Sequence, residues 1–356
     1  MRLCVALLSF LIVTAGQRQF SNTPLDNPFR SFDAAPVSEV KISGKVIAAI
    51  NNGDFVHPTF SPDGKILAYS KVLVRADFEN TEVFLYNLRS RKTSVVLDSK
   101  RAEGYASYKA FVADMNWRSP KRLEVVISDG DVDSTRLIFD PYTRKLLRER
   151  NEGYDEAEAQ PMSPIYKKAR QQAVSLFPVF PRDVLDNALR NSALVIPDRG
   201  ILLQKNYAGH DDNIWFLDFQ SKSIRSLISL SDGSSNAFNG GLSFKSSIII
   251  LLHNKPKTYL FVYQDGKIKG LAEINSTSSN HIEVKHLSSR RVVFLVRTHE
   301  AYERGDNPLF IFDGDKLVRV KEYPELYDAE VDRSGQRIAY CYWEGDRRHI
   351  AIKELN

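Results

Sequence analysis

The chain has 356 residues, of which 43% are hydrophobic, 11% aromatic and 26% charged, a composition typical of a globular protein with a sizeable core. Its 49 Lys and Arg residues exceed its 44 Asp and Glu residues by five, which gives a formal charge of +5. Because this excess is small for so long a chain, composition argues against a nucleic-acid-binding protein.

The N-terminal segment has the pattern of a secretory signal peptide. Arg2 precedes an apolar run from Leu3 to Val13, and small residues follow in Thr14-Ala15-Gly16. Because the run is short for a bilayer span, we predict a cleaved signal over residues 1–16, with an N-terminal anchor helix as the alternative. Cleavage would leave no membrane span, and we expect a periplasmic or secreted protein. It would also remove Cys4 and leave Cys341 alone, so we expect no internal disulfide.

Residues 17–40 contain Asn, Pro, Ser and Asp with few periodic apolar positions, which predicts an extended linker or arm. The first clear hairpin follows from His57 to Val72. Its turn, Ser61-Pro62-Asp63-Gly64, combines a fixed φ at Pro with a glycine suited to positive φ. The same hairpin returns at residues 328–340, where Gly335 takes the place of Gly64. A repeated hairpin indicates a repeat architecture.

A second pattern, a strand followed by a polar turn and another strand, recurs six times. Its first strands begin near residues 83, 137, 214, 259, 309 and 349. Four-stranded units that repeat at about 40 to 50 residues predict an all-β, six-bladed β-propeller over residues 41–356. The last copy ends before its outer strand, and Ser43 to Ile50 reads as an outer strand without a partner. We therefore predict that the N-terminal strand completes the C-terminal blade.

The spacing between the second and third copies is about thirty residues longer than a blade requires. Residues 151–191 lack strand alternation, and Ile165 to Leu176 suits a short helix. The sequence predicts a helical insertion here, and a divergent seventh blade is the alternative.

The repeat resembles the blade unit of TolB-like β-propellers. Phe60 to Gly64 with Leu67-Ala68-Tyr69 matches the whole motif of an aromatic, Ser-Pro-Asp-Gly and an Ile-Ala-Tyr-like strand, and Val331 to Tyr340 matches it in part. Too few residues precede the propeller for the N-terminal α/β domain of TolB. The resemblance implies a secreted or envelope-associated interaction module.

Four polar residues are candidates for a binding site in the central channel. Because the first strand of each propeller blade lines the channel, the aligned hairpins place His57, Asp114 and Asp328 at equivalent positions, with Glu330 two residues on. The alternative is that they hydrate the channel or cap turns. The other histidines lack metal-ligand spacing, and no Gly-x-Ser-x-Gly nucleophile motif occurs, so we predict no catalytic set, no metal and no cofactor.

The sequence therefore favours an exported, monomeric and non-catalytic scaffold that binds a protein or peptide. An enzyme of the polysaccharide lyase or hydrolase type, or a small-ligand or sugar binder using the channel, is the alternative. We expect loops such as Arg75 to Thr81 and His299 to Asn307 to decorate the propeller faces.

Overall fold

The computed structural model describes residues 20–21, 32, 37–41, 44–51, 53–75, 78–105, 110–128, 134–152, 163–191, 193–205, 213–229, 237–254, 257–275, 280–298, 307–321 and 325–355. The predicted signal peptide lies outside these residues, as does most of the predicted arm.

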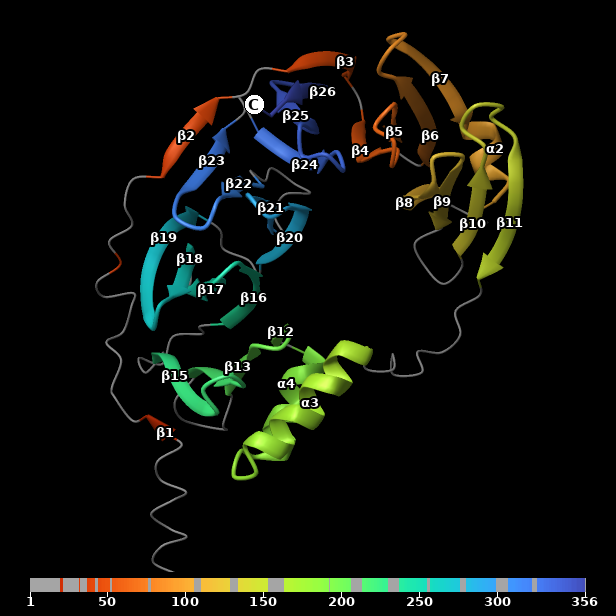
Figure 1. Ribbon diagram of the computed structural model, residues 1–356. Helices are drawn as coiled ribbons and strands as arrows, with labels where there is room; N and C mark the ends of the chain where they lie inside the picture. Colours follow the sequence, from red (N-terminus) through yellow and green to blue (C-terminus); the bar gives the residue numbers. More distant parts are fainter. Residues whose placement is uncertain are drawn as a thin grey trace, which may run out of the picture. The chain divides into compact units, whose positions relative to one another are not determined.

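Six sheets of four antiparallel strands each follow one another along the chain, which confirms the six-bladed β-propeller (Figure 1). Each blade is a meander in which sequential strands are neighbours. The first three blades are β4 (Asp54–Phe60), β5 (Ile66–Arg75), β6 (Phe78–Asn87) and β7 (Lys92–Leu97); β8 (Phe111–Ser119), β9 (Arg122–Ser128), β10 (Ser134–Phe139) and β11 (Leu146–Glu152); and β12 (Leu194–Ile196), β13 (Gly200–Lys205), β14 (Asn213–Asp218) and β15 (Ser223–Ser229). The next two are β16 (Ala237–Phe244), β17 (Ser247–Asn254), β18 (Lys257–Gln264) and β19 (Lys267–Asn275); and β20 (Asn280–Leu287), β21 (Val292–Thr298), β22 (Leu309–Phe312) and β23 (Leu317–Lys321).

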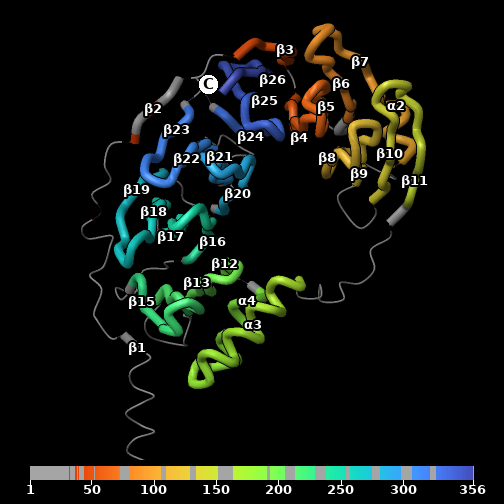
Figure 2. The backbone as a smooth tube through the Cα atoms, viewed as in Figure 1, coloured from red at the N-terminus to blue at the C-terminus, as the bar shows by residue number. Residues whose placement is uncertain are grey.

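The sixth, closing blade joins the two ends of the propeller sequence, as predicted. It consists of β24 (Glu325–Val331), β25 (Arg337–Glu344), β26 (Arg347–Glu354) and the N-terminal strand β3 (Lys45–Ile50), and Figure 2 shows β3 beside β26. The hydroxyl of Tyr340 accepts a hydrogen bond from the Gly44 backbone at 2.6 Å, which ties the entry of β3 to the blade core.

Two short segments of the N-terminal region add parallel strands to blade edges. β1 (Phe20–Ser21) pairs with β15, and β2 (Ser38–Lys41) pairs with β23. The predicted arm therefore contacts blades at two places along its length.

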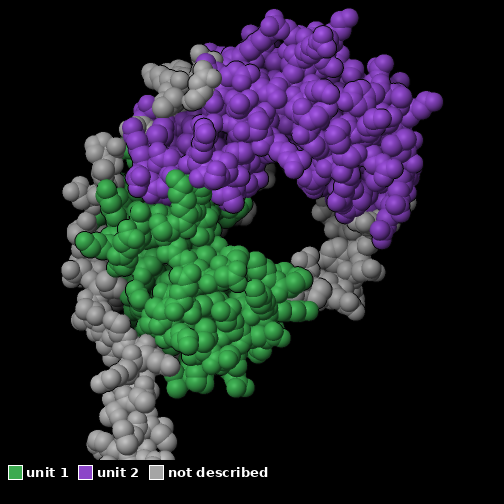
Figure 3. Space-filling view, in the orientation of Figure 1, with its two compact units in different colours: residues 1–37, 160–282 green, residues 38–159, 283–356 purple. Residues whose placement is uncertain are grey.

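The chain divides into two compact units, coloured separately in Figure 3. Unit 1 contains residues 1–37 and 160–282, and unit 2 contains residues 38–159 and 283–356. All the residues of the candidate site described below belong to unit 2.

The two matching hairpins use the same turn with reciprocal side chains. In the first, the hydroxyl of Ser61 accepts from the Ile66 backbone at 3.0 Å and donates to Asp63 at 2.7 Å. In the second, the carboxylate of Asp332 accepts from the Arg337 backbone at 3.1 Å, and Ser334 donates to it at 2.9 Å. In both turns, a side-chain oxygen at the first position accepts a hydrogen bond from the backbone N–H that closes the turn. Ser-x-Asp-Gly and Asp-x-Ser-Gly therefore form the same turn.

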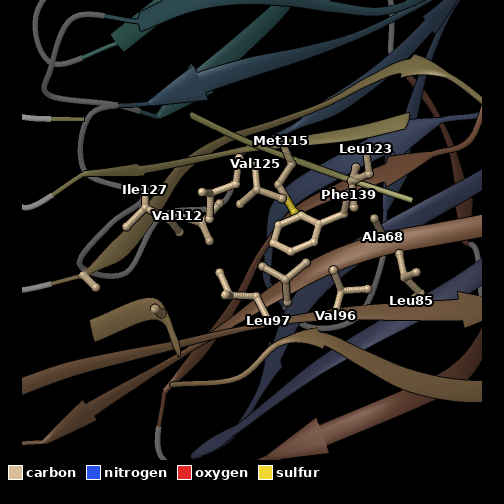
Figure 4. Close-up of a cluster of buried hydrophobic side chains, with 14 of the residues drawn as sticks. Ala68, Leu85, Val96, Leu97, Val112, Met115, Leu123, Val125, Ile127 and Phe139 are labelled. Atoms are coloured by element: carbon tan, nitrogen blue, oxygen red, sulfur yellow. The ribbon is translucent and has the colours of Figure 1, made fainter. Parts of the chain in front are cut away.

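Within each unit, apolar side chains from facing sheets join neighbouring blades. Figure 4 shows one such cluster, in which Ala68, Leu85 and Val96 of blade β4–β7 meet Leu123 and Phe139 of blade β8–β11. Apolar residues alternate along the strands and supply these layers, so the core of each unit is divided among its blades.

Two helices lie in the described part of the predicted insertion (residues 151–191), whose first two residues belong to β11. α3 (Pro164–Leu176) agrees with the helix expected from Ile165 to Leu176, and α4 (Arg182–Asn191) follows it. Both helices bury apolar residues in a cluster with Ile201 and Leu203 of β13. Among the described residues of this segment there is a helical pair and no seventh blade.

One expected loop differs from the structure, and the other, His299 to Asn307, lies outside the described residues except for Asn307. The segment from Arg75 to Thr81 is not a loop over its described residues, because β5 continues to Arg75 and β6 begins at Phe78, with Arg75 paired to Phe78. The short helix α2 (Ser99–Glu103), capped by the side chain of Asp98, was not predicted. In the described part of the chain, no helix has the length and apolar character required to cross a membrane.

Candidate functional site: a charged cluster beside a small pocket

The candidate site begins with a cluster of five ionisable side chains on β20, β21 and β24. Lys285 is only 7% exposed, and its ammonium lies 2.8 Å from Glu283, 3.7 Å from Glu330 and 3.8 Å from Asp328. Arg297 donates to Glu283 at 2.8 Å and to Asp328 at 3.0 Å. Two cations are thus shared among three carboxylates.

Asp328 is the most buried carboxylate of the cluster. Besides Arg297, it accepts hydrogen bonds from the backbone N–H of His57 at 3.1 Å and from that of Ala329 at 2.9 Å. Burial alone would raise the pKa of Asp328, but the positive charges of Lys285 and Arg297 outweigh it and hold the pKa below its usual value. Asp328 is therefore a fixed anion, and it cannot serve as a general acid near neutral pH.

The two glutamates of the cluster differ in their proton affinity. Burial raises the pKa of Glu330 to about 7, and the negative charges of Asp328 and Glu283 support the increase while Lys285 opposes it. For Glu283, burial acts in the same direction, but the charges of Lys285 and Arg297 prevail and lower the pKa. Glu330 is thus the cluster carboxylate that titrates near neutral pH.

A β-bulge explains how His57 reaches Asp328. The innermost strands of four blades carry one extra residue at matching positions, between Val56 and Thr59, Val112 and Asp114, Phe238 and Gly241, and Leu326 and Asp328. In β4 the bulge places His57 at φ 53°, although it precedes a proline, which favours extended backbone. This conformation turns the His57 N–H toward the Asp328 carboxylate.

The four predicted site residues do not all come together. His57 and Asp328 are in direct contact, and Glu330 joins them through Lys285. Asp114 directly follows the corresponding bulge of β8, but it is exposed and accepts a hydrogen bond from Asn116 at 2.6 Å. Asp114 has no place in the cluster or among the residues that line the pocket beside it.

That pocket has a volume of about 140 Å³ and mixes aromatic with polar walls. It is lined by Asp54, Val56, His57, Arg297, Asn307, Tyr327, Asp328 and Trp343. The guanidinium of Arg348 stacks on Trp343 at 3.2 Å from the ring centroid and bonds Asp54 at 2.9 Å. Fully buried Asn307 donates to the Tyr327 carbonyl at 2.7 Å, which fixes the opposite wall. The walls of the pocket are thus held in place before any ligand arrives.

Sequence reasoning missed the two cations and most of the pocket wall. Among the wall residues that it missed, Trp343 is half-buried at the pocket. Lys285 and Arg297 carried no motif, although charged residues at alternate positions of an innermost strand, such as Glu283 and Lys285, are a usable signal. Within the described residues, no group of three or more His, Cys, Asp or Glu side chains is arranged to hold a metal ion.

The structure thus defines a six-bladed β-propeller with a charged cluster and a small pocket beside its closing blade. No protein-family model matches the chain, and no curated protein matches it. It is similar to the β-propeller domain of the Trilobed protease from Pyrococcus furiosus, with 13% identity, 85% of each chain covered and a TM-score of 0.29. It is also similar to TolB from Acinetobacter baumannii, with 12% identity, 85% of this chain and 64% of that chain covered, and a TM-score of 0.32.

A gluconolactonase from Xanthomonas campestris is similar as well, at 12% identity, with 90% of this chain and 99% of that chain covered and a TM-score of 0.35. The chain spans 46% of the acylaminoacyl peptidase from Pyrococcus horikoshii, and so less than half of that enzyme. These proteins have different activities, and identities this low assign none of them to this chain.

Proposed function

We propose that this protein is an exported, non-catalytic binding module that accepts one uncharged side chain of a protein or peptide partner in the pocket beside Asp328. The observation that carries the proposal is a pre-formed pocket of about 140 Å³ in which each carboxylate of the wall already has a guanidinium partner.

The size of the pocket favours a side chain over a whole small molecule. Pockets for small-molecule ligands usually measure about 300–1,000 Å³, so this one has about half the lower limit. A pocket of this size suits an anchor residue that projects from a larger partner surface. Trp343, Tyr327 and Val56 supply the apolar contact that such an anchor requires.

The charges of the pocket favour an uncharged anchor. Asp54 is paired with Arg348 and Asp328 with Arg297, so the lining carboxylates are already compensated. A charged side chain would lose its hydration here without gaining an uncompensated opposite charge from the described lining residues. Aromatic or aliphatic anchors avoid that cost.

The N-terminal sequence supports the proposed cellular setting. The apolar N-terminal run with small residues at its end supports export to the periplasm or the medium, and the TolB-like hairpins support an interaction role there. We propose that the protein acts as a monomer, because a partner anchored in one pocket needs no second copy.

An enzyme or sugar binder in the same place is the second candidate. One observation favours it: Glu330, with a pKa of about 7, suits general acid–base catalysis. Glu330 does not line the pocket, however, and the lining carboxylate Asp328 has a lowered pKa. The enzyme reading thus requires a reacting group away from the cavity, and we rank it second.

Saturation-transfer NMR with small probes tests the proposal. One buried apolar side chain contributes about 1.5–3 kcal/mol, so isolated anchors will bind in the millimolar range, where this method works. The probes are the N-acetyl amides of Phe, Leu, Lys and Glu, together with galacturonic acid and glucose. We expect saturation of the Phe or Leu probe, and its loss in Val56→Trp, which fills the pocket.

The matched control is Val95→Trp on the exposed face of β7, which should leave probe binding unchanged. Binding of a saccharide without binding of the amides would overturn the proposal in favour of the sugar binder. Equal binding to both tryptophan variants would place recognition elsewhere on the protein.

A further inference from the structure

A second apolar site lies in unit 1, on the outer half of blade β16–β19. Phe32 is half-buried there, and its ring contacts two aromatic side chains of β18 edge to face. The ring centroids are 4.9 Å apart for Tyr259 and 5.3 Å apart for Phe261. Phe32 also packs against the buried cluster that contains Leu252 and Phe261. A residue from the N-terminal arm therefore completes the core of a blade that lies far along the sequence.

Gly270 in β19 creates the space for this ring. A Cβ atom at Gly270 would lie 2.7 Å from the nearest carbon of Phe32, closer than real contacts allow. The ladder between β18 and β19 carries a bulge at this point, where Phe261 faces Gly270 and Leu260 faces Ala272. Glycine inside a strand is unfavourable unless something approaches the backbone closely, and here the approaching group is an aromatic ring.

The arm is bound to the blades on both sides of Phe32. Upstream, β1 pairs in parallel with β15, with Phe20 opposite Ile224. Downstream, β2 pairs in parallel with β23, with Glu39 opposite Arg319. Strand pairing of this kind supplies backbone hydrogen bonds without side-chain specificity, so the pocket for Phe32 provides the register.

We propose that β18 and β19 carry a second binding site, a slot for an aromatic side chain presented by a separate segment, and that Phe32 of the chain's own arm is its resident ligand. The slot is shaped by the missing side chain of Gly270 and lined by Tyr259 and Phe261. A segment from another protein that presents an aromatic residue in the same way would have to displace the arm.

Limited proteolysis of the mature, full-length chain tests whether Phe32 holds the arm. Trypsin cleaves after Arg30, two residues before Phe32, and mass spectrometry reports the rate. Because the slot buries a large part of an aromatic side chain, Phe32→Ala should speed this cleavage by about ten-fold. Gly270→Val should have a similar effect, because its side chain would occupy the slot.

The double variant Phe32→Ala/Gly270→Val is the decisive control. If both changes act through one slot, the double variant is cleaved no faster than either single variant. Multiplied rates would mean that Gly270→Val disturbs the blade independently, and would overturn the proposed slot. Unchanged cleavage in Phe32→Ala would overturn it as well.

A peptide that copies residues 26–37 tests the ligand class directly. With a fluorescent label, it should bind the full-length Phe32→Ala variant, whose slot is empty, at least ten-fold more tightly than it binds the wild type. The same peptide with alanine at the position of Phe32 should not bind. Equal binding of the two peptides would contradict recognition of an aromatic side chain.

Discussion

Replacing Glu330 by glutamine should stabilise the protein, and by more at high pH than at low pH. The folded pKa of Glu330 is about 7, whereas an unfolded glutamate has a pKa of about 4.3. Between these values the unfolded chain has released the proton that the folded protein retains, so this group lowers stability as the pH rises. Above about pH 7 the destabilisation reaches its full value, and below about pH 4 it disappears.

The size of the effect follows from the two pKa values. A difference of about 2.7 pH units corresponds to at most about 3.7 kcal/mol, because one unit is worth about 1.36 kcal/mol. The Glu330 side chain is 30% exposed, and solvent screening reduces the figure to about 2 kcal/mol. The amide of the Glu330→Gln variant carries no charge, so the variant escapes this cost. Lys285 keeps Glu283 and Asp328 as partners in the variant.

Urea unfolding of the wild type and Glu330→Gln at about pH 5 and about pH 8 measures the difference. We expect the variant to be more stable by about 2 kcal/mol at about pH 8 and by about 0.5 kcal/mol at about pH 5. Glu149→Gln, on the exposed part of β11, is the matched control and should follow the wild type at both pH values. A variant that is less stable than the wild type at about pH 8 would refute the reasoning, because it would show that ionised Glu330 is net favourable.

Three further changes probe the closing blade and the cluster. Asp328→Asn leaves Arg297 with less compensation and should cost about 3 kcal/mol in urea unfolding near neutral pH. Because the pKa of Asp328 is lowered, this loss should shrink as the pH falls below about 4 and disappear only below the folded pKa, and a pH-independent loss would contradict the charge argument. Tyr340→Phe removes the hydrogen bond from Gly44 and should cost about 1 kcal/mol, with faster hydrogen exchange in β3, whereas unchanged exchange would show that the bond does not hold this strand. Cys341 is fully buried and burial raises the pKa of its thiol, so iodoacetamide should label it only at the rate of unfolding, and rapid labelling of the native protein would be inconsistent with this structure.

The blade plan could be predicted from sequence because each blade repeats the same local chemistry. The turn glycines Gly64 and Gly335 have φ values of 64° and 73°, the positive values that the turn requires. The partner of β3 was also predictable, because a blade that lacks its outer strand and a strand without a partner complement each other. These inferences depend on neighbours in the sequence and on counting repeats.

Tertiary contacts decided what the sequence left open. The extension of β5 to Arg75 depends on its pairing with Phe78, and no turn motif in the sequence predicts this pairing. The bulge that points the N–H of His57 at Asp328 depends on a backbone conformation that a residue before proline disfavours. The sequence alignment therefore placed His57 and Asp328 at equivalent strand positions. It predicted neither the hydrogen bond between them nor the absence of Asp114 from the cluster.

The cluster cations were hidden because β20 reverses the usual pattern of a strand. Val284 is 47% exposed, whereas the side chain of its neighbour Lys285 is only 7% exposed. A period-two reading would turn Val284 toward a core and Lys285 toward water. The structure has the opposite arrangement because Lys285 lies within 3.8 Å of three carboxylates, and a buried ammonium requires such partners. In β20 the ion pairs of Lys285, and not its apolar residues, determine which side chain is buried. We therefore place the candidate site at this cluster and its pocket.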